Sequence, residues 1–226
     1  MLFRSRFLNP VPLLVPFLFS SLASAADPSR GPDVVIAGDS YSAGVLGSYF
    51  EKTFKGQGQK VSRYGISSSF VKHWLEKSPS DKTVGPGVGV DWVSPGRSGS
   101  GHAPADYPKL REILMGEAKN AKMLVIILGT NGICQGRTVS DAGALAEQAT
   151  AAIPGIKCFW VGPELFRSEC GGDFKRQREF SMALGQAVSG NCTFIDSTTL
   201  GLDPGQAPHR NDNASAWAAA VATKLK

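Results

Sequence analysis

The chain has 226 residues, of which 24 are basic and 19 acidic, and 42% of its residues are hydrophobic. This composition is that of a globular protein and excludes a fibrous or disordered chain. The formal net charge of +5 comes from scattered lysines and arginines rather than from a run, so we expect no nucleic-acid partner.

The first 26 residues have the pattern of a secretory signal peptide. Arg4 and Arg6 precede an apolar stretch at residues 11–19, and Ala23-Ser24-Ala25 supplies the small residues of a cleavage site. The stretch is short and interrupted by prolines, so we expect no membrane span after processing; an uncleaved anchor is the alternative. Removing the segment leaves 22 basic and 19 acidic residues, a net charge of +3. The sequence predicts an exported bacterial protein, periplasmic or secreted, with one domain at residues 27–226.

The first predicted strand ends in a serine. Its apolar residues, Val35 to Gly38, are followed directly by Asp39 and Ser40. Residues just past the carboxyl end of a buried parallel strand face the crevice in which open α/β sheets bind ligands. Ser40 is therefore a candidate nucleophile, although the same residues also suit a strand-to-helix turn with a helix cap.

Strand and helix patterns alternate along the rest of the chain, which predicts a doubly wound parallel sheet. Four further strands are expected at residues 60–64, 123–129, 156–162 and 192–196. Helical spacing of apolar residues occurs at 42–54, 107–118, 141–153, 174–188 and 214–225. We therefore expect a single-domain, three-layer α/β/α sandwich around a five-stranded parallel sheet, a flavodoxin-like arrangement.

Residues 78–105 interrupt this alternation with many glycines and prolines, which exclude a long helix. A loop of this length in a compact domain is either functional or a plain insertion. As a functional loop it would form a lid or a substrate wall, with Trp92 and His102 as the residues that contact substrate.

Polar residues also follow other predicted strands: Gly65 and the serines after it, Thr130 and Asn131, and His209 near the carboxyl terminus. The order Gly-Asp-Ser, Gly, Gly-Thr-Asn and late His resembles that of the SGNH hydrolases, also called GDSL-type esterases. The resemblance spans nearly the whole chain after residue 26 and implies the fold of that superfamily.

The resemblance implies a role for each of these residues. Ser40 is the expected nucleophile and His209 the base that takes its proton. The backbone N–H groups of Ser40 and Gly65, with the side-chain amide of Asn131, are the expected oxyanion hole. Two other histidines compete for the role of base: His73, beside a tryptophan, and His102.

The carboxylate that orients His209 departs from the family pattern. The family usually places an aspartate three positions before the histidine, and Gln206 stands there. Asp203 is the expected third member of the triad, since a Pro-Gly turn can return its carboxylate to the imidazole. The alternatives are a Ser–His dyad or a site that binds without hydrolysing. Asp196 is read as structural.

The four cysteines lie in the second half of a chain predicted to be exported, where disulfides persist. Within the implied fold, the strands near residues 156 and 192 are neighbours, which favours a Cys158–Cys192 bond. Cys134 and Cys170 both follow strand ends, which favours a Cys134–Cys170 bond. This is one of three possible pairings.

The predicted function is ester hydrolysis through a Ser40 acyl-enzyme, with O-acetyl groups of an envelope or extracellular polysaccharide as the first-choice substrate. Asp39 and Trp92 are the expected substrate contacts. No cofactor and no metal site are expected, and the protein is expected to be a monomer. The alternatives are a lipase or other acyl-ester hydrolase, a non-catalytic glycan-binding protein with a degraded triad, and an acetyltransferase that uses the same intermediate.

Overall fold

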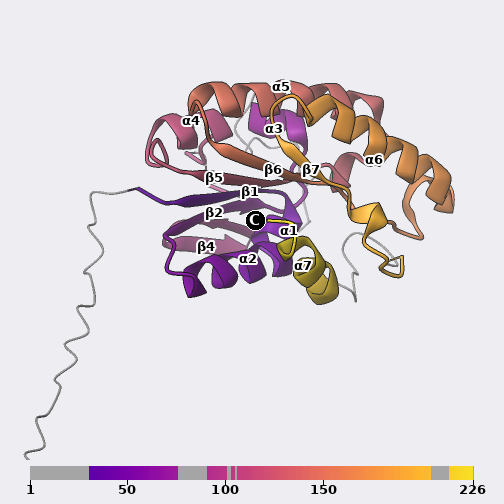
Figure 1. Cartoon of the computed structure of the whole chain (residues 1–226), viewed down its shortest axis with the longest axis horizontal. Helices are drawn as coiled ribbons and strands as arrows, with labels where there is room; N and C mark the ends of the chain where they lie inside the picture. The colour runs from indigo at the N-terminus through magenta and orange to yellow at the C-terminus, as the bar shows by residue number, and fades with distance from the viewer. Residues whose placement is uncertain (1–30, 76–90, 101–102, 105, 205–213, 226) are drawn as a thin grey trace, which may run out of the picture.

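The computed structural model describes residues 31–75, 91–100, 103–104, 106–204 and 214–225. The predicted signal peptide, His102, Gln206 and His209 lie outside these ranges. The described residues form one α/β/α sandwich, as predicted, with the sheet between two layers of helices (Figure 1).

The sheet has seven strands in the order β4-β3-β2-β1-β5-β6-β7. They are β1 Val34–Gly38, β2 Val61–Ile66, β3 Asp91–Ser94, β4 Arg97–Ser100, β5 Met123–Ile127, β6 Lys157–Val161 and β7 Thr193–Ile195. The five parallel strands are the five that the sequence predicted. β1 lies between β2 and β5 and is buried along its whole length, which explains its unbroken apolar sequence.

The prediction of five strands was wrong, because part of the Gly/Pro-rich segment is a hairpin. β3 pairs antiparallel with β2, and β4 pairs antiparallel with β3. Pro95 and Gly96 form the turn, and Gly96 has the positive φ, 71°, that favours glycine at this point of a turn. Gly99 faces the ring of Trp92, where an added Cβ would lie 3.0 Å from a ring carbon. These glycines and this proline therefore shape a hairpin rather than a loop.

Helices cover both faces of the sheet. α1, α2 and α7 lie on one face, and α3, α4, α5 and α6 on the other (Figure 1). The helices are α1 Ser40–Ala43, α2 Val45–Gly56, α3 Val71–Leu75, α4 Leu110–Met115, α5 Gly136–Ala152, α6 Phe174–Val188 and α7 Ala214–Ala222. The described residues also form three short 3₁₀ turns: η1 Thr130–Gly132 after β5, η2 Glu169–Gly172 before α6, and η3 Ser197–Thr199 after β7.

The helices bury apolar stripes against the sheet. Leu46, Phe50 and Phe54 recur every four residues on α2 and are all buried. Trp217 of α7 is fully buried, and its ring meets that of Tyr41 edge to face at a centroid distance of 4.8 Å. The helix that follows His209 in the sequence is therefore packed against the helix that begins at Ser40. Among the described residues, no helix combines the length and apolar character needed to cross a bilayer.

The turn from β1 into α1 packs unusually closely on β2. The Ser42 hydroxyl donates to Asp39 O, or to Tyr64 O, each at 2.9 Å, so it bridges β1 and β2. A Cβ added to Gly65 would lie 2.3 Å from the backbone nitrogen of Ala43, closer than real contacts allow. Only glycine at this position of β2 permits α1 to lie where it does.

We predict that Gly65→Ala lowers the free energy of unfolding by about 1–3 kcal/mol, the usual cost of overpacking, because backbone must move to make room. Urea unfolding measures the change. Gly56→Ala is the matched control, since nothing lies within 4 Å of the added Cβ and alanine favours a helix. Equal effects of the two substitutions would contradict the packing argument.

Candidate functional site

Three neighbouring strand ends bring the candidate residues to one edge of the sheet. β2, β1 and β5 are parallel and adjacent, so their carboxyl ends meet at the same edge. Ser40 comes two residues after β1, Asn131 comes four residues after β5, and the serines at 67–69 follow β2 directly. The structure thus places Ser40 just past the end of the central strand of the three, and a polar loop follows each of the two neighbouring strands.

Ser40 is the first residue of α1 and is partly exposed. The turn that holds it is fixed at both ends: the Asp39 N–H donates to Ile127 O of β5 at 3.1 Å, and the Tyr41 N–H donates to the Asp39 carboxylate at 3.1 Å. A serine held this way presents its hydroxyl from a rigid strand-to-helix junction, the geometry expected of a positioned nucleophile.

Asp39 has no exposed surface, so the substrate contact expected of it does not fit the structure. Its Oδ1 caps α1 by accepting the Tyr41 N–H, and its Oδ2 is buried without a hydrogen-bond partner among the described residues. Burial raises the pKa of Asp39 from 3.8 to about 7, against the smaller opposing effect of the Tyr41 N–H. The buried Asp39 carboxyl therefore holds the turn that carries Ser40, and it has no surface that a substrate could contact.

Gly65 does not lie in the crevice loop, contrary to expectation. The strand continues to Ile66, so Gly65 sits inside β2, paired with Gly38 on one side and Val93 on the other. Its N–H belongs to the sheet, and its missing Cβ makes room for α1. The sequence pattern ended the strand two residues early, which put the glycine at the wrong place.

Ser68 has an available backbone donor in the loop after β2. In the loop after β2, Ser67 N–H donates to Asp91 O at 2.9 Å, and Ser69 N–H donates to Ile66 O at 3.2 Å. The Ser68 N–H between them makes no hydrogen bond to any described residue. Ser68 also has a φ of 63°, a conformation rare for serine and common at functional sites. No residue pattern around Ser68 in the sequence indicates this conformation or an available N–H group.

Asn131 ties the two flanking loops together. Its Nδ2 donates to Ser69 O at 2.9 Å, across 62 residues of sequence. An amide nitrogen carries two hydrogens, so one remains for a ligand while the other holds the side chain in place. The 3₁₀ turn η1 that carries Asn131 begins after Gly129, whose φ is 120°. The hydrogen bond to Ser69 O brings this amide donor next to the Ser68 N–H, at the edge of the sheet where β1 leads into Ser40.

Of the expected base and the carboxylate that orients it, the structure describes only the carboxylate. His209 lies outside the described residues, and Asp203 is an exposed residue of the segment after η3. His73 is buried, and its Nδ1 accepts the Phe70 N–H at 3.0 Å, so this nitrogen is not available to a serine hydroxyl. Asp196 caps η3 and accepts from Ser181 at 2.8 Å, which is the structural role expected of it.

Trp92 lies on β3 opposite Ile66, near the loop that carries Ser68. Its ring is partly buried, and the Arg97 guanidinium lies 5.7 Å from the ring centre. A cation over one face of the ring stabilises this packing and leaves less of the ring for a ligand. Contact between Trp92 and a substrate stays a prediction.

The structure contains the two disulfides that strand order favoured. Cys158 bonds to Cys192 across the neighbouring strands β6 and β7, and Cys134 bonds to Cys170. Cys134 comes three residues after Asn131, so the second bond ties the Asn131 loop to the segment after β6. No group of metal-ligating side chains occurs among the described residues.

Comparison with known proteins gives one sequence relative and several structures. Protein BcsX of Komagataeibacter xylinus is 28% identical over 179 residues, which cover 75% of this chain and 65% of BcsX, less than two thirds of that protein. No family model matches the chain.

Among solved structures, TesA superposes with a TM-score of 0.55 at 15% identity, over 85% of this chain and 97% of TesA. The lipase Lip_vut3 from a goat rumen metagenome gives 0.55 at 10% identity, over 84% and 95%. A carbohydrate esterase family 2 enzyme with a carbohydrate-binding domain, from Corynascus thermopiles (Myceliophthora fergusii), gives 0.54 at 16%, over 85% and 64%. The chain therefore has the SGNH hydrolase fold that its strand-end residues indicated.

The buried carboxyl of Asp39 predicts a pH-dependent stability. Because its pKa is about 7 in the folded protein and 3.8 when exposed, the folded state keeps a proton that the unfolded chain releases between these values. The free energy of unfolding should therefore fall as the pH rises from 4 to 7. The amide introduced by Asp39→Asn cannot ionise and still caps a helix, so this variant should lose that fall and exceed the wild type at pH 8 by at most roughly 4 kcal/mol.

Urea unfolding from pH 4 to pH 8 measures the difference between the two proteins. Parallel pH profiles for the wild type and Asp39→Asn would contradict the account. Asp173→Asn is a matched control, because Asp173 also caps a helix, by accepting the Arg176 N–H, but is exposed.

Proposed function

We propose that this protein is an exported esterase that cleaves an ester through a covalent Ser40 acyl-enzyme. The observation that carries the proposal is the arrangement at the carboxyl edge of β1. β1 ends at a partly exposed serine, and the loops that follow its two neighbouring strands carry a fixed side-chain amide, that of Asn131, and a backbone N–H, that of Ser68, which bonds no described residue. Donors on fixed backbone and side chains stabilise the oxyanion of a tetrahedral intermediate, the charge that forms in acyl transfer.

In the proposed reaction, the Ser40 hydroxyl attacks the acyl carbon while His209 takes its proton. The negative charge that develops on the carbonyl oxygen is met by the N–H groups of Ser40 and Ser68 and by Asn131. The ester C–O bond then breaks, and the alcohol leaves with the proton held by His209. Water attacks the acyl-enzyme with the same histidine as base, which releases the carboxylic acid and restores Ser40.

The packing of α7 supports His209 as the base. Trp217 of α7 contacts Tyr41, the residue after Ser40, and its Nε1 donates to Ser197 at 2.9 Å. Ala214, the first residue of α7, comes five positions after His209, so the chain must pass near Ser40 shortly after the histidine. Asp203, the nearest preceding carboxylate, is proposed to orient the imidazole.

The proposed substrate is an O-acetyl group on an envelope or extracellular polysaccharide. A carbohydrate esterase of the same fold supports this choice, and two disulfides with the predicted signal peptide support export. The lipase Lip_vut3 has the same fold, so a longer acyl ester is the competing substrate. Asn131 and Gln135, the polar residues of the loop after β5, favour the sugar ester over an apolar chain.

Chromogenic aryl esters of increasing acyl length test the proposal. We expect the wild type to hydrolyse the acetate faster than the octanoate, and Ser40→Ala to lose activity by about 10³-fold or more. Ser48→Ala, an exposed serine of α2, is the matched control. Equal activity in the wild type and Ser40→Ala would remove the nucleophile, and a preference for octanoate would favour the lipase.

A second prediction concerns Asn131. Asn131→Ala should lower kcat by about 10²–10³-fold with a much smaller change in KM, since the oxyanion exists only in the transition state. Asn191→Ala is the control, because Asn191 is exposed and its side chain bonds only Thr150, at 2.9 Å, among described residues. A fall in kcat of less than about threefold, in a variant that unfolds like the wild type, would exclude Asn131 from the oxyanion hole.

A further inference from the structure

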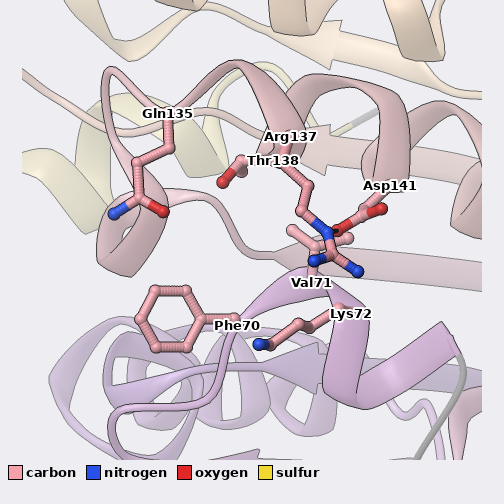
Figure 2. Close-up of a pocket in the computed structure, with 7 residues that line it drawn as sticks. All are labelled: Phe70, Val71, Lys72, Gln135, Arg137, Thr138 and Asp141. Carbon is pink, nitrogen blue, oxygen red and sulfur yellow. Dashed lines mark ion pairs between the residues drawn. The ribbon is translucent and has the colours of Figure 1, made fainter.

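A pocket of about 150 Å³ lies between the start of α3 and the start of α5. Figure 2 shows Phe70 and Lys72 on the α3 side of it, with Gln135 and Arg137 on the α5 side. Asp141, one helical turn after Arg137, forms an ion pair with it at 3.7 Å. Nothing in the proposed reaction uses this pocket.

The pocket shares both of its loops with the candidate active site. Phe70 directly follows Ser69, whose carbonyl accepts from Asn131, and Gln135 comes four residues after Asn131. The Gln135 N–H donates to Gly132 O at 3.0 Å, within the same turn. A ligand in the pocket therefore lies directly beside the donors proposed to bind the oxyanion.

The lining chemistry fits a sugar ring. The Lys72 ammonium lies 6.0 Å from the centre of the Phe70 ring, so only the ring face away from Lys72 is offered to the C–H face of a pyranose. Gln135 offers an amide, Arg137 N–H donors and Asp141 carboxylate acceptors for the hydroxyl groups of the sugar. An acyl chain would take these polar groups out of water without replacing the hydrogen bonds that they make to it, which is costly. A phosphate would be attracted by Lys72 and Arg137 but repelled by the Asp141 carboxylate, with which the guanidinium is already paired.

The size of the pocket agrees with one ring. A cavity of about 150 Å³ is known to take up one benzene molecule, so this volume suits a single six-membered ring. The ring of Phe70 is also held in place before any ligand binds. His73, which is buried, meets it edge to face at 5.6 Å and accepts the Phe70 N–H. A pre-positioned ring lowers the entropy cost of binding.

We propose that this pocket, lined by Phe70, Gln135, Arg137 and Asp141, is a subsite for one pyranose residue of the polysaccharide whose acyl group reaches Ser40. The sugar bound there is a neighbour of the acylated one. This inference rests on the proposed function for its substrate, but the subsite itself can be tested without catalysis.

The direct test is binding to the Ser40→Ala protein. Hexasaccharides of glucose, xylose, mannose and N-acetylglucosamine that carry no O-acyl group are titrated into this protein. Calorimetry and tryptophan fluorescence are the readouts. We expect at least one of them to bind, and Phe70→Ala or Arg137→Ala in the same background to weaken that binding at least tenfold. Tyr49→Ala, a half-exposed aromatic of α2, should leave it within twofold.

Failure of all four hexasaccharides to bind would overturn the subsite. So would binding that Phe70→Ala and Arg137→Ala leave unchanged. Because Arg137 is exposed, its variant is expected to fold even if Phe70→Ala does not. Circular dichroism of each variant checks this.

Kinetic measurements on protein that retains Ser40 link the subsite to the reaction. The ratio of kcat/KM for an O-acetylated hexasaccharide to kcat/KM for an aryl acetate should fall at least fivefold in Phe70→Ala and Arg137→Ala, mainly through KM. An unchanged ratio would contradict the subsite. Absence of wild-type activity on either ester would instead refute the proposed function, and the binding titration would still decide the subsite.

Discussion

The position of Ser40 depends on how closely α1 approaches β2. The Ser42 hydroxyl reaches both Asp39 O and Tyr64 O, and the missing Cβ of Gly65 gives the backbone of Ala43 its room. The helix is only four residues long, so it has few contacts of its own to hold it. Its place is therefore set by the strand beneath it and by Trp217 of α7 beside it.

Hydrogen bonds also hold the two loops beside Ser40, which follow β2 and β5. The loop after β2 is bonded at Ser67, Ser69 and Phe70, and the side chains of Asn131 and Trp74 both bond Ser69, the latter at 3.0 Å to its hydroxyl. A site whose donors are fixed before the substrate arrives does not spend binding energy on ordering them. The same bonds orient Phe70 toward the neighbouring pocket, so one set of contacts serves both the proposed reaction and the proposed sugar subsite.

Much of the fold and of the candidate site could be predicted from the sequence, because buried segments have a recognisable pattern of apolar residues. Strands buried on both faces are continuous apolar runs, and the polar residues that end them, Ser40 and Asn131, stood out for that reason. Ser68 could not be found in this way: its φ of 63° belongs to a turn closed by the bond from Ser69 N–H to Ile66 O, at a position where glycine, not serine, is the usual residue. Asp39 was predicted to contact substrate because an aspartate that caps a helix and one that binds a ligand can occur in the same sequence pattern. Only the burial of Asp39 in the structure distinguishes the two roles. The β3–β4 hairpin was missed because glycines that shape a turn and admit a Trp92 ring have the composition of a loop.

The central claim is that Ser40 becomes covalently acylated. The most direct measurement is peptide mapping by mass spectrometry after the protein has been treated with an active-site-directed organophosphonate, which captures a serine nucleophile as a stable adduct. The account predicts one adduct, on the peptide that contains Ser40, and none on the same peptide of the Ser40→Ala protein. An unmodified Ser40 peptide, or an equal adduct on another serine in both proteins, would contradict it.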